Sequence, residues 1–163
     1  MQGAKVSDEI TVTGQLSAPQ LKEAHEEGFH SMLNLRAPEE EGFPADEKEQ
    51  AEAAGLTYVN IPVRKTEISD DLTTRVLSAI DRLPKPALIH CATGMRAGAM
   101  AFMHMATRGG LSAEQAMEKA QAMGFDCNSE PQRKQFFEHY VDAHSSTNPR
   151  NEEGKECRSD TPG

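Results

Sequence analysis

Cysteine is scarce in this sequence, and its scarcity excludes several classes of protein. The 163 residues contain three cysteines, an odd number, and no C-x-x-C pair. A disulfide framework needs paired cysteines, and a structural zinc site needs cysteines or histidines at ligand spacing. Since an H-E-x-x-H motif is also absent, we expect neither disulfides nor a metal site, and the sequence indicates no cofactor.

The sequence also lacks long apolar runs and has fewer basic than acidic residues. No apolar run is long enough to cross a membrane, and residues 1–8 lack the apolar core of a signal peptide. The formal net charge is −9, with 17 Lys and Arg against 26 Asp and Glu, which argues against nucleic acid as a partner. We therefore expect a soluble, cytoplasmic protein that binds neither membrane nor nucleic acid.

The length and composition favour one folded domain with a terminal extension. A chain of 163 residues has room for a single hydrophobic core, and 37% of its residues are hydrophobic. Residues 145–163 consist mainly of Ser, Asn, Pro, Gly and charged residues without periodicity. The sequence therefore predicts a single domain over residues 1–144 and a disordered tail over residues 145–163.

The stretch from residue 87 to residue 99 combines a predicted strand, a tight loop and the start of a helix. Ala87–Ile89 is a short apolar run introduced by two prolines, which keep the following residues extended. Residues 97–108 contain no proline and can form a helix. Cys91 is thus expected at the carboxyl end of a strand, facing a helix N-terminus, where ligands of open α/β sheets bind.

The residue types in this loop suit the binding of an oxyanion and an attack on it. Backbone N–H groups in front of a helix N-terminus form an anion cradle, and the same field favours a Cys91 thiolate. Gly94 permits a positive φ, and Arg96 offers a planar fork of donors. We expect His90 to orient the loop or polarise Cys91. The candidate binding residues of the loop are His90, Ala92, Thr93, Gly94 and Met95. A buried, inert cysteine is the alternative, and it does not account for the glycine and arginine at this spacing.

The motif resembles that of the cysteine-dependent protein phosphatases, His-Cys-x5-Arg-Ser/Thr. It departs from that pattern twice, because only four residues separate Cys91 from Arg96 and Ala97 replaces the hydroxyl residue. The C-x-x-G-x-R form instead matches single-domain rhodaneses, which carry sulfur on the cysteine. The beta-lactamase-hydrolase-like, phosphatase-like family combines such a short loop with a phosphatase-like chain, and this sequence resembles it over roughly residues 10–125. The upstream segments that carry the resemblance are residues 14–17, 28–29, 34–41 and 61–63.

In the phosphatases, the loop after the third strand supplies the acid that protonates the leaving group. Here the corresponding slot falls near Arg64 or Lys65, and neither is an acid. Glu67 is the candidate acid. Asp70 and Asp71 follow Ser69 and are expected in the first turn of a helix, where carboxylates stabilise the helix dipole. Arg36, at the end of an earlier strand, is a further candidate for substrate binding, and Arg64 and Lys65 are expected at the mouth of the site.

The pattern of elements predicts an α/β fold: a four- to five-stranded, mostly parallel sheet with helices on both faces, phosphatase-like. Strands are expected over residues 10–13, 29–35, 56–63 and 87–89. Helices are expected over residues 17–28, 44–54, 70–83, 97–108 and 112–123, with a last helix that opens at residue 129. Residues 39–41 form an acidic run, most of which is expected to be solvated. One of these glutamates is a candidate to face the site, because loops after strand ends line the crevice.

The resemblance implies a hydrolase of the dual-specificity-phosphatase-like type, acting on a small anionic or phosphorylated substrate. Its cysteine nucleophile, Cys91, would form a phosphocysteine while Arg96 and the phosphate-binding loop at residues 92–96 hold the oxygens. The short loop and the doubtful acid keep a rhodanese-like sulfurtransferase open, with a persulfide on Cys91. A non-catalytic anion-binding module is the third interpretation.

Overall fold

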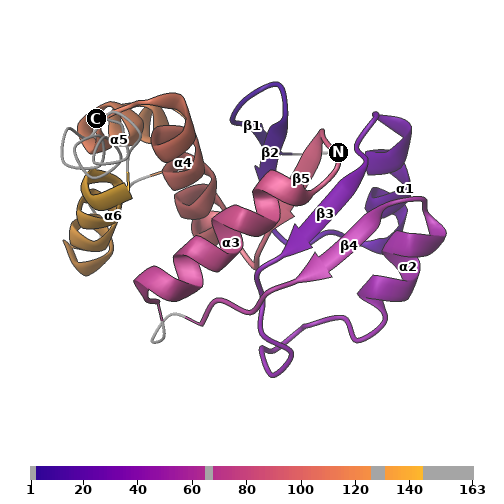
Figure 1. The fold of residues 1–163 in the computed structure, drawn as a ribbon. Helices are drawn as coiled ribbons and strands as arrows, with labels where there is room; N and C mark the ends of the chain where they lie inside the picture. Colours follow the sequence, from indigo (N-terminus) through magenta and orange to yellow (C-terminus); the bar gives the residue numbers. More distant parts are fainter. Residues whose placement is uncertain (1–2, 65–67, 126–130, 145–163) are drawn as a thin grey trace, which may run out of the picture. The chain divides into compact units, whose positions relative to one another are not determined.

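The computed structural model describes residues 3–64, 68–125 and 131–144 (Figure 1). Lys65, Glu67, the expected helix opening at residue 129 and the expected tail over 145–163 lie outside the described residues. The chain divides into two compact units, Met1–Ala101 and Phe102–Gly163. The cysteine motif falls within the first unit.

A five-stranded sheet organises the first unit. Its strands are β1 (Ala4–Lys5), β2 (Ile10–Thr13), β3 (Ser31–Asn34), β4 (Thr57–Asn60) and β5 (Ala87–His90), in the order β1-β2-β5-β3-β4. All neighbours are parallel except β1, which pairs antiparallel with β2. The predicted α/β fold with a mostly parallel sheet is confirmed. β1 was not predicted, because two residues carry no recognisable strand pattern.

β5 is the central strand, and this fixes where Cys91 lies. Every residue of β5 and of β3 is buried, as expected for strands that are covered on both faces. The parallel register places Thr13, His90 and Asn34 at the same level, at the carboxyl ends of β2, β5 and β3. Loops that follow these three strands therefore meet around the residue after His90.

Helices cover both faces of this sheet, as predicted. α1 (Ala18–Glu26) and α2 (Glu47–Ala53) lie on one face, where Leu21 and Ala51 belong to a core with Met32 and Leu88. α3 (Asp70–Arg82) lies on the other face (Figure 1). α1 begins after a capping box at Ser17, in agreement with the predicted start.

The predicted start of α2 was wrong by three residues. Pro44 was expected to open the helix, but α2 begins at Glu47. Asp46, with φ of −104° and ψ of 16°, is not helical, and residues 44–47 form a turn in which the Glu47 N–H donates to the Pro44 carbonyl at 3.2 Å. The turn places Glu47 in the first turn of α2, and its side chain is buried.

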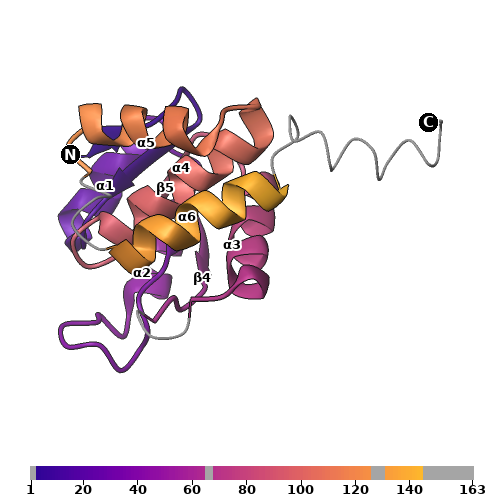
Figure 2. The same cartoon turned by 90° about the vertical axis from the view of Figure 1, so that its left-hand side faces the viewer.

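In the second unit, the described residues form the later part of α4 and two further helices. α4 spans Met95–Gly109, α5 spans Ala113–Ala122 and α6 spans Pro131–His144. Ser112 caps α5 with the capping box that its spacing to Gln115 predicts. α5 packs against α6 (Figure 2), and the Phe102 and Phe125 rings meet edge to face at 5.7 Å. Because α4 begins at residue 95 rather than 97, Arg96 belongs to its first turn.

Candidate active site

Cys91 leaves the end of the central strand and is completely buried. Its N–H donates to the Thr13 carbonyl at 3.3 Å, so the sheet pairing extends one residue beyond β5. The β2–α1 turn lies directly against the loop, because a Cβ on Gly14 would stand 2.9 Å from the Ala92 carbonyl oxygen. Only glycine permits this approach, which holds the loop after Cys91 against the neighbouring strand end.

Two backbone donors converge on the Cys91 sulfur. The Gly94 N–H lies 3.1 Å from Sγ and the Ala97 N–H lies 3.4 Å from it. Gly94 has a φ of 96°, in the left-handed region that favours glycine. Ala97 belongs to the first turn of α4, so its donor also carries the positive end of the helix dipole. The arrangement favours negative charge on the sulfur.

The guanidinium of Arg96 is buried beside this sulfur and is held in one orientation. Its NH1 donates to the Val63 carbonyl at 2.8 Å. Its NH1 and NH2 groups form a two-pronged ion pair with the Glu40 carboxylate, at 2.7 and 2.9 Å. Hydrogen bonding to Glu40 raises the pKa of Arg96 despite burial, and the neighbouring Cys91 acts in the same direction. Arg96 is therefore a fixed cation at the cradle.

Glu40 is the member of the acidic run 39–41 that contacts Arg96, and the sequence did not distinguish it from its two neighbours. Hydrogen bonding to Arg96 is the largest cause that lowers the pKa of Glu40 to about 2, while burial opposes it. The Ala37 N–H and Arg36 Nε also donate to this carboxylate, at 2.9 and 3.2 Å. Glu40 thus stays ionised at neutral pH, which suits an anchor for Arg96 and excludes it as a proton donor in this arrangement. Its location after β3, at the same sheet edge as Cys91, was the available signal.

Arg36 is placed near the site, but its donors are used to hold the loop after β3. NH1 donates to Gln15 Oε1 at 2.7 Å, and NH2 donates to the Glu41 carbonyl at 2.6 Å. The side chain is buried and also pairs with Glu40. In this arrangement Arg36 supports the loop that carries Glu40.

Of the other residues predicted near the mouth of the site, Arg64 lies within the described residues. Arg64 forms an exposed ion pair with Glu39, which lowers the pKa of that carboxyl. Lys65 and the candidate acid Glu67 lie outside the described residues. On the cysteine loop itself, Ala92 and Met95 are half-buried, whereas Thr93 is exposed.

The two carboxylates at the start of α3 have the structural position that the sequence predicted. Asp70 and Asp71 lie in the first turn of α3. Ser69 is the N-cap, and its hydroxyl accepts a hydrogen bond from the Leu72 N–H at 3.1 Å. Carboxylates in a first turn stabilise the helix dipole.

His90 lies behind the loop, in a buried polar cluster that the sequence did not predict. Its Nε2 lies 2.9 Å from Glu47 Oε1, and both side chains are essentially inaccessible to solvent. Its Nδ1 faces the Cys91 carbonyl oxygen at 3.4 Å. Glu47 also accepts hydrogen bonds from Gln15, Asn34 and Tyr58. Burial alone would raise the pKa of Glu47, but these donors, His90 foremost, lower it overall.

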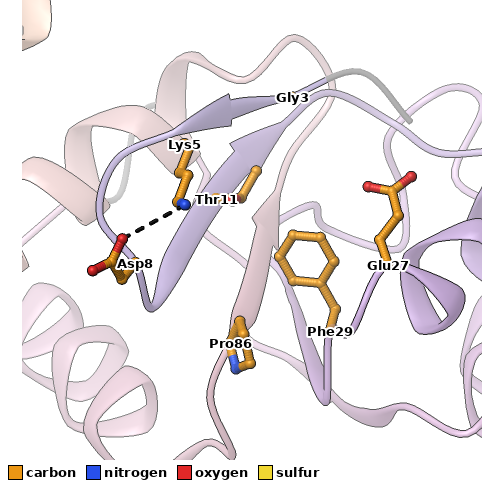
Figure 3. A pocket seen from close by; sticks show the side chains of 7 residues that line it. All are labelled: Gly3, Lys5, Asp8, Thr11, Glu27, Phe29 and Pro86. Carbon is orange, nitrogen blue, oxygen red and sulfur yellow. Dashed lines mark ion pairs between the residues drawn. The ribbon is translucent and has the colours of Figure 1, made fainter.

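A cavity of about 310 Å³ lies at the other end of the sheet (Figure 3). Phe29 and Pro86, which line it, precede β3 and β5, whereas Cys91 follows β5. Lys5 and Asp8 form an exposed ion pair on its rim. This cavity is therefore separate from the cysteine loop.

The part of the chain that the structure describes contains neither a metal cluster nor a membrane-spanning helix. Within it, no group of three or more His, Cys, Asp or Glu side chains is arranged to hold a metal ion. No described helix has both the length and the apolar character needed to span a bilayer.

Comparison with known proteins gives matches that cover the cysteine motif. The family described as beta-lactamase hydrolase-like protein, phosphatase-like domain, matches residues 4–107. A beta-lactamase hydrolase-like protein of Xylella fastidiosa (strain Temecula1 / ATCC 700964) is 28% identical over an alignment of 129 residues, which covers 77% of this chain. The match spans only 30% of that relative's length.

Solved structures share the fold at low sequence identity. A DUF442 protein from Shewanella putrefaciens CN-32 matches with a TM-score of 0.75 and 20% identity, over 88% of this chain and 93% of that one. The core catalytic domain of the PP-IP phosphatase SIW14 from S. cerevisiae, in complex with citrate, matches with a TM-score of 0.71 and 22% identity. That match covers 94% of this chain and 91% of the yeast domain.

Proposed function

The chain belongs to the beta-lactamase hydrolase-like protein, phosphatase-like domain family, and from this premise we propose that it is a cysteine-dependent hydrolase of phosphate esters. The observation that carries the proposal is the geometry around Cys91 Sγ: two backbone donors point at the sulfur, and Arg96 is fixed beside it. These are the groups that would stabilise a thiolate nucleophile and the oxygens of a bound phosphoryl group.

The proposed reaction has two steps. The Cys91 thiolate attacks phosphorus, the bond from phosphorus to the ester oxygen breaks, and the alkoxide or phenoxide leaves with the electron pair. Water then attacks the phosphocysteine, the sulfur–phosphorus bond breaks, and inorganic phosphate leaves while Cys91 returns to the thiolate. Arg96 and the loop N–H groups would hold the non-bridging oxygens through both steps.

The leaving group decides how much an acid matters in the first step. Glu40 is ionised and cannot supply a proton, and Glu67 is the candidate that the sequence provides. A nitrophenolate leaves without protonation, whereas an alkoxide needs a proton. Glu67→Gln is therefore expected to lower turnover of alkyl phosphates and to leave p-nitrophenyl phosphate hydrolysis nearly unchanged.

The test of the proposal is hydrolysis of p-nitrophenyl phosphate by the full chain and by Cys91→Ser. We expect turnover in the wild type that disappears in Cys91→Ser, together with a phosphocysteine mass on Cys91 after rapid acid quench. Cys127→Ser is the matched control for cysteine removal and should keep full activity. A pure, folded protein with no Cys91-dependent release of nitrophenol would reject the hydrolase proposal.

Sulfur transfer is the second candidate, favoured by the short loop and by Ala97 in place of the hydroxyl residue after Arg96. Four residues between Cys91 and Arg96 leave less room than five, and the transfer of a sulfane sulfur needs no acid for a leaving alkoxide. The Cys91 thiolate would attack the sulfane sulfur of thiosulfate, and sulfite would leave with the electron pair of the broken sulfur–sulfur bond. Cyanide would then remove the outer sulfur as thiocyanate and regenerate the thiolate.

The two candidates are separated by the mass that Cys91 acquires. Thiosulfate should add one sulfur atom to Cys91 if the protein transfers sulfur, and cyanide should release that sulfur as thiocyanate. Absence of the added sulfur would dispose of this candidate. Oxyanion protection of Cys91 without turnover of either substrate would instead favour the anion-binding module.

A further inference from the structure

The ring of His90 is held between two hydrogen-bond acceptors. Nε2 faces the carboxylate of Glu47 at 2.9 Å, and Nδ1 faces the carbonyl oxygen of Cys91 at 3.4 Å. Neither acceptor can donate a hydrogen bond when Glu47 is ionised. A neutral imidazole carries one N–H and would satisfy only one of them. The doubly protonated ring satisfies both.

The surroundings of Glu47 keep its carboxylate charged. Asn34 Nδ2 and Tyr58 OH donate to Oε1 at 3.0 and 2.9 Å, and Gln15 Nε2 donates to Oε2. Burial, with Glu47 as a neighbour, raises the pKa of Tyr58, so this phenol remains a donor throughout the neutral range. Arg36 is linked to the cluster through Gln15, because its NH1 donates to Gln15 Oε1 at 2.7 Å.

We propose that Glu47 is a positioning residue for the nucleophile, which holds His90 as an imidazolium behind Cys91 and so favours the thiolate. This inference deepens the proposed function and rests on it for the role of Cys91 as the nucleophile. The Glu47–His90 pair has no net charge in this state. Its positive end, the His90 ring, faces the Cys91 backbone, and its negative end, the Glu47 carboxylate, lies toward α2. A buried dipole in that orientation stabilises negative charge on the loop.

Removal of the Glu47 charge therefore has a defined consequence. An unpaired imidazolium in a buried site is costly, so His90 is expected to lose one proton in Glu47→Gln. The dipole behind Cys91 then disappears, although Gln keeps the size of Glu. Tyr58→Phe is the matched control, because it removes one donor to the same carboxylate oxygen and keeps both charges.

The experiment uses the full chain and two readouts that need no substrate turnover. The ¹⁵N chemical shifts of the His90 ring report its protonation, and the rate of iodoacetamide alkylation between pH 5 and 9 reports thiolate formation, with peptide mass mapping to isolate Cys91. We expect both His90 nitrogens to be protonated at pH 7 in the wild type and only one in Glu47→Gln. Alkylation at pH 6 should be about tenfold slower in Glu47→Gln, equivalent to a shift of one pH unit. Glu47→Asp should give an intermediate rate, and Tyr58→Phe should match the wild type.

Three outcomes would overturn the inference. The first is a singly protonated His90 in the wild type at pH 7, which needs no variant and decides the matter even if Glu47→Gln fails to fold. The second is an alkylation profile of Glu47→Gln that coincides with the wild type. The third is an equal slowing in Tyr58→Phe, which would indicate a packing role. If the expected shifts appear but no phosphate or sulfur turnover is found, the proposed function fails, while the effect of Glu47 on His90 and on the Cys91 thiolate stands.

Discussion

Two roles are proposed for the Arg96 guanidinium: its charge activates the Cys91 thiol, and its planar fork of donors binds an oxyanion. One edge is bound by Glu40 and the Val63 carbonyl, and the charge lies beside Cys91. An arginine fork matches two oxygens at once, whereas a lysine ammonium supplies charge without that match. Binding of an oxyanion and activation of the thiol should therefore respond differently to substitution.

Arg96→Ala should slow alkylation of Cys91 by iodoacetamide near pH 6 and abolish protection by phosphate or sulfate, because both the charge and the fork are lost. Arg96→Lys should restore part of the alkylation rate and little of the protection. Peptide mass mapping follows Cys91 against Cys127 and Cys157. Equal rates at Cys91 and Cys157 in the wild type would contradict an activated thiolate.

The Glu40–Arg96 pair gives the fold a defined dependence on pH. The pKa of Glu40 is about 2 in the folded chain and near 4.5 in the reference state. Because the folded value is the lower one, the unfolded chain takes up the proton first as the pH falls, so the stabilisation is present above pH 4.5 and is lost toward pH 2.

Glu40→Gln should thus lower the free energy of unfolding by about 1–2 kcal/mol at pH 7, and the difference should shrink below pH 4. Urea denaturation at pH 7, 4 and 2.5 measures it. Glu41→Gln makes the same charge change at an exposed side chain and should have little effect. A deficit in Glu40→Gln that is independent of pH would show that the ion pair is not its cause.

At the scale of elements, the turn from β5 into α4 depends on the backbone of Gly94. Its φ of 96° directs its N–H to the Cys91 sulfur. A Cβ there would lie no closer than 3.6 Å to its neighbours, so the cost of a side chain is conformational rather than steric. Gly28, which follows α1, has a φ of 104° and open space around it.

Gly94→Ala and Gly28→Ala should each lower the free energy of unfolding by about 1 kcal/mol, because both force alanine into the left-handed region. Only Gly94→Ala should also slow the alkylation of Cys91, since it displaces a donor from the sulfur. Denaturation curves and alkylation rates of the two variants test this. Equal alkylation rates in both would mean that the Gly94 N–H does not activate the thiol.

At the scale of the whole molecule, the net negative charge of the chain repels an anionic ligand. The chain carries −9, and the described arginines near Cys91 are matched by Glu39 and Glu40. Attraction of an anion must therefore come from the fixed donors of the loop and from Arg96 rather than from the overall field. This favours a small substrate that enters the cradle over a large polyanion that needs an extended basic surface.

The sequence predicts that the folded part of the molecule ends at residue 144. A chain truncated after His144 should unfold in one cooperative transition, with a free energy within about 0.5 kcal/mol of the full chain and the same Cys91 alkylation rate. Urea denaturation, monitored by circular dichroism, measures the cooperativity and the free energy of unfolding. A loss of more than about 1 kcal/mol would place part of residues 145–163 in the domain.

The sequence by itself determined what depends on neighbours along the chain. The apolar run before Cys91, the capping residues Ser17 and Ser112, and the glycine in the loop each act through local backbone geometry. The strand, loop and helix around Cys91, the α/β class and the mostly parallel sheet could be predicted from such patterns. The two-residue strand β1 and the start of α2 could not, because the local signal there was short or ambiguous.

The tertiary structure decided which distant side chains meet at the cysteine loop. Glu40 is 56 residues from Arg96, and Glu47 is 43 residues from His90. Along the chain, Glu40 belongs to an acidic run and Glu47 to a predicted helix that is rich in charged residues. They become an anchor for Arg96 and a buried hydrogen-bond partner of His90 because the parallel register brings the ends of β2, β3 and β5 together. No spacing in the sequence contains that information.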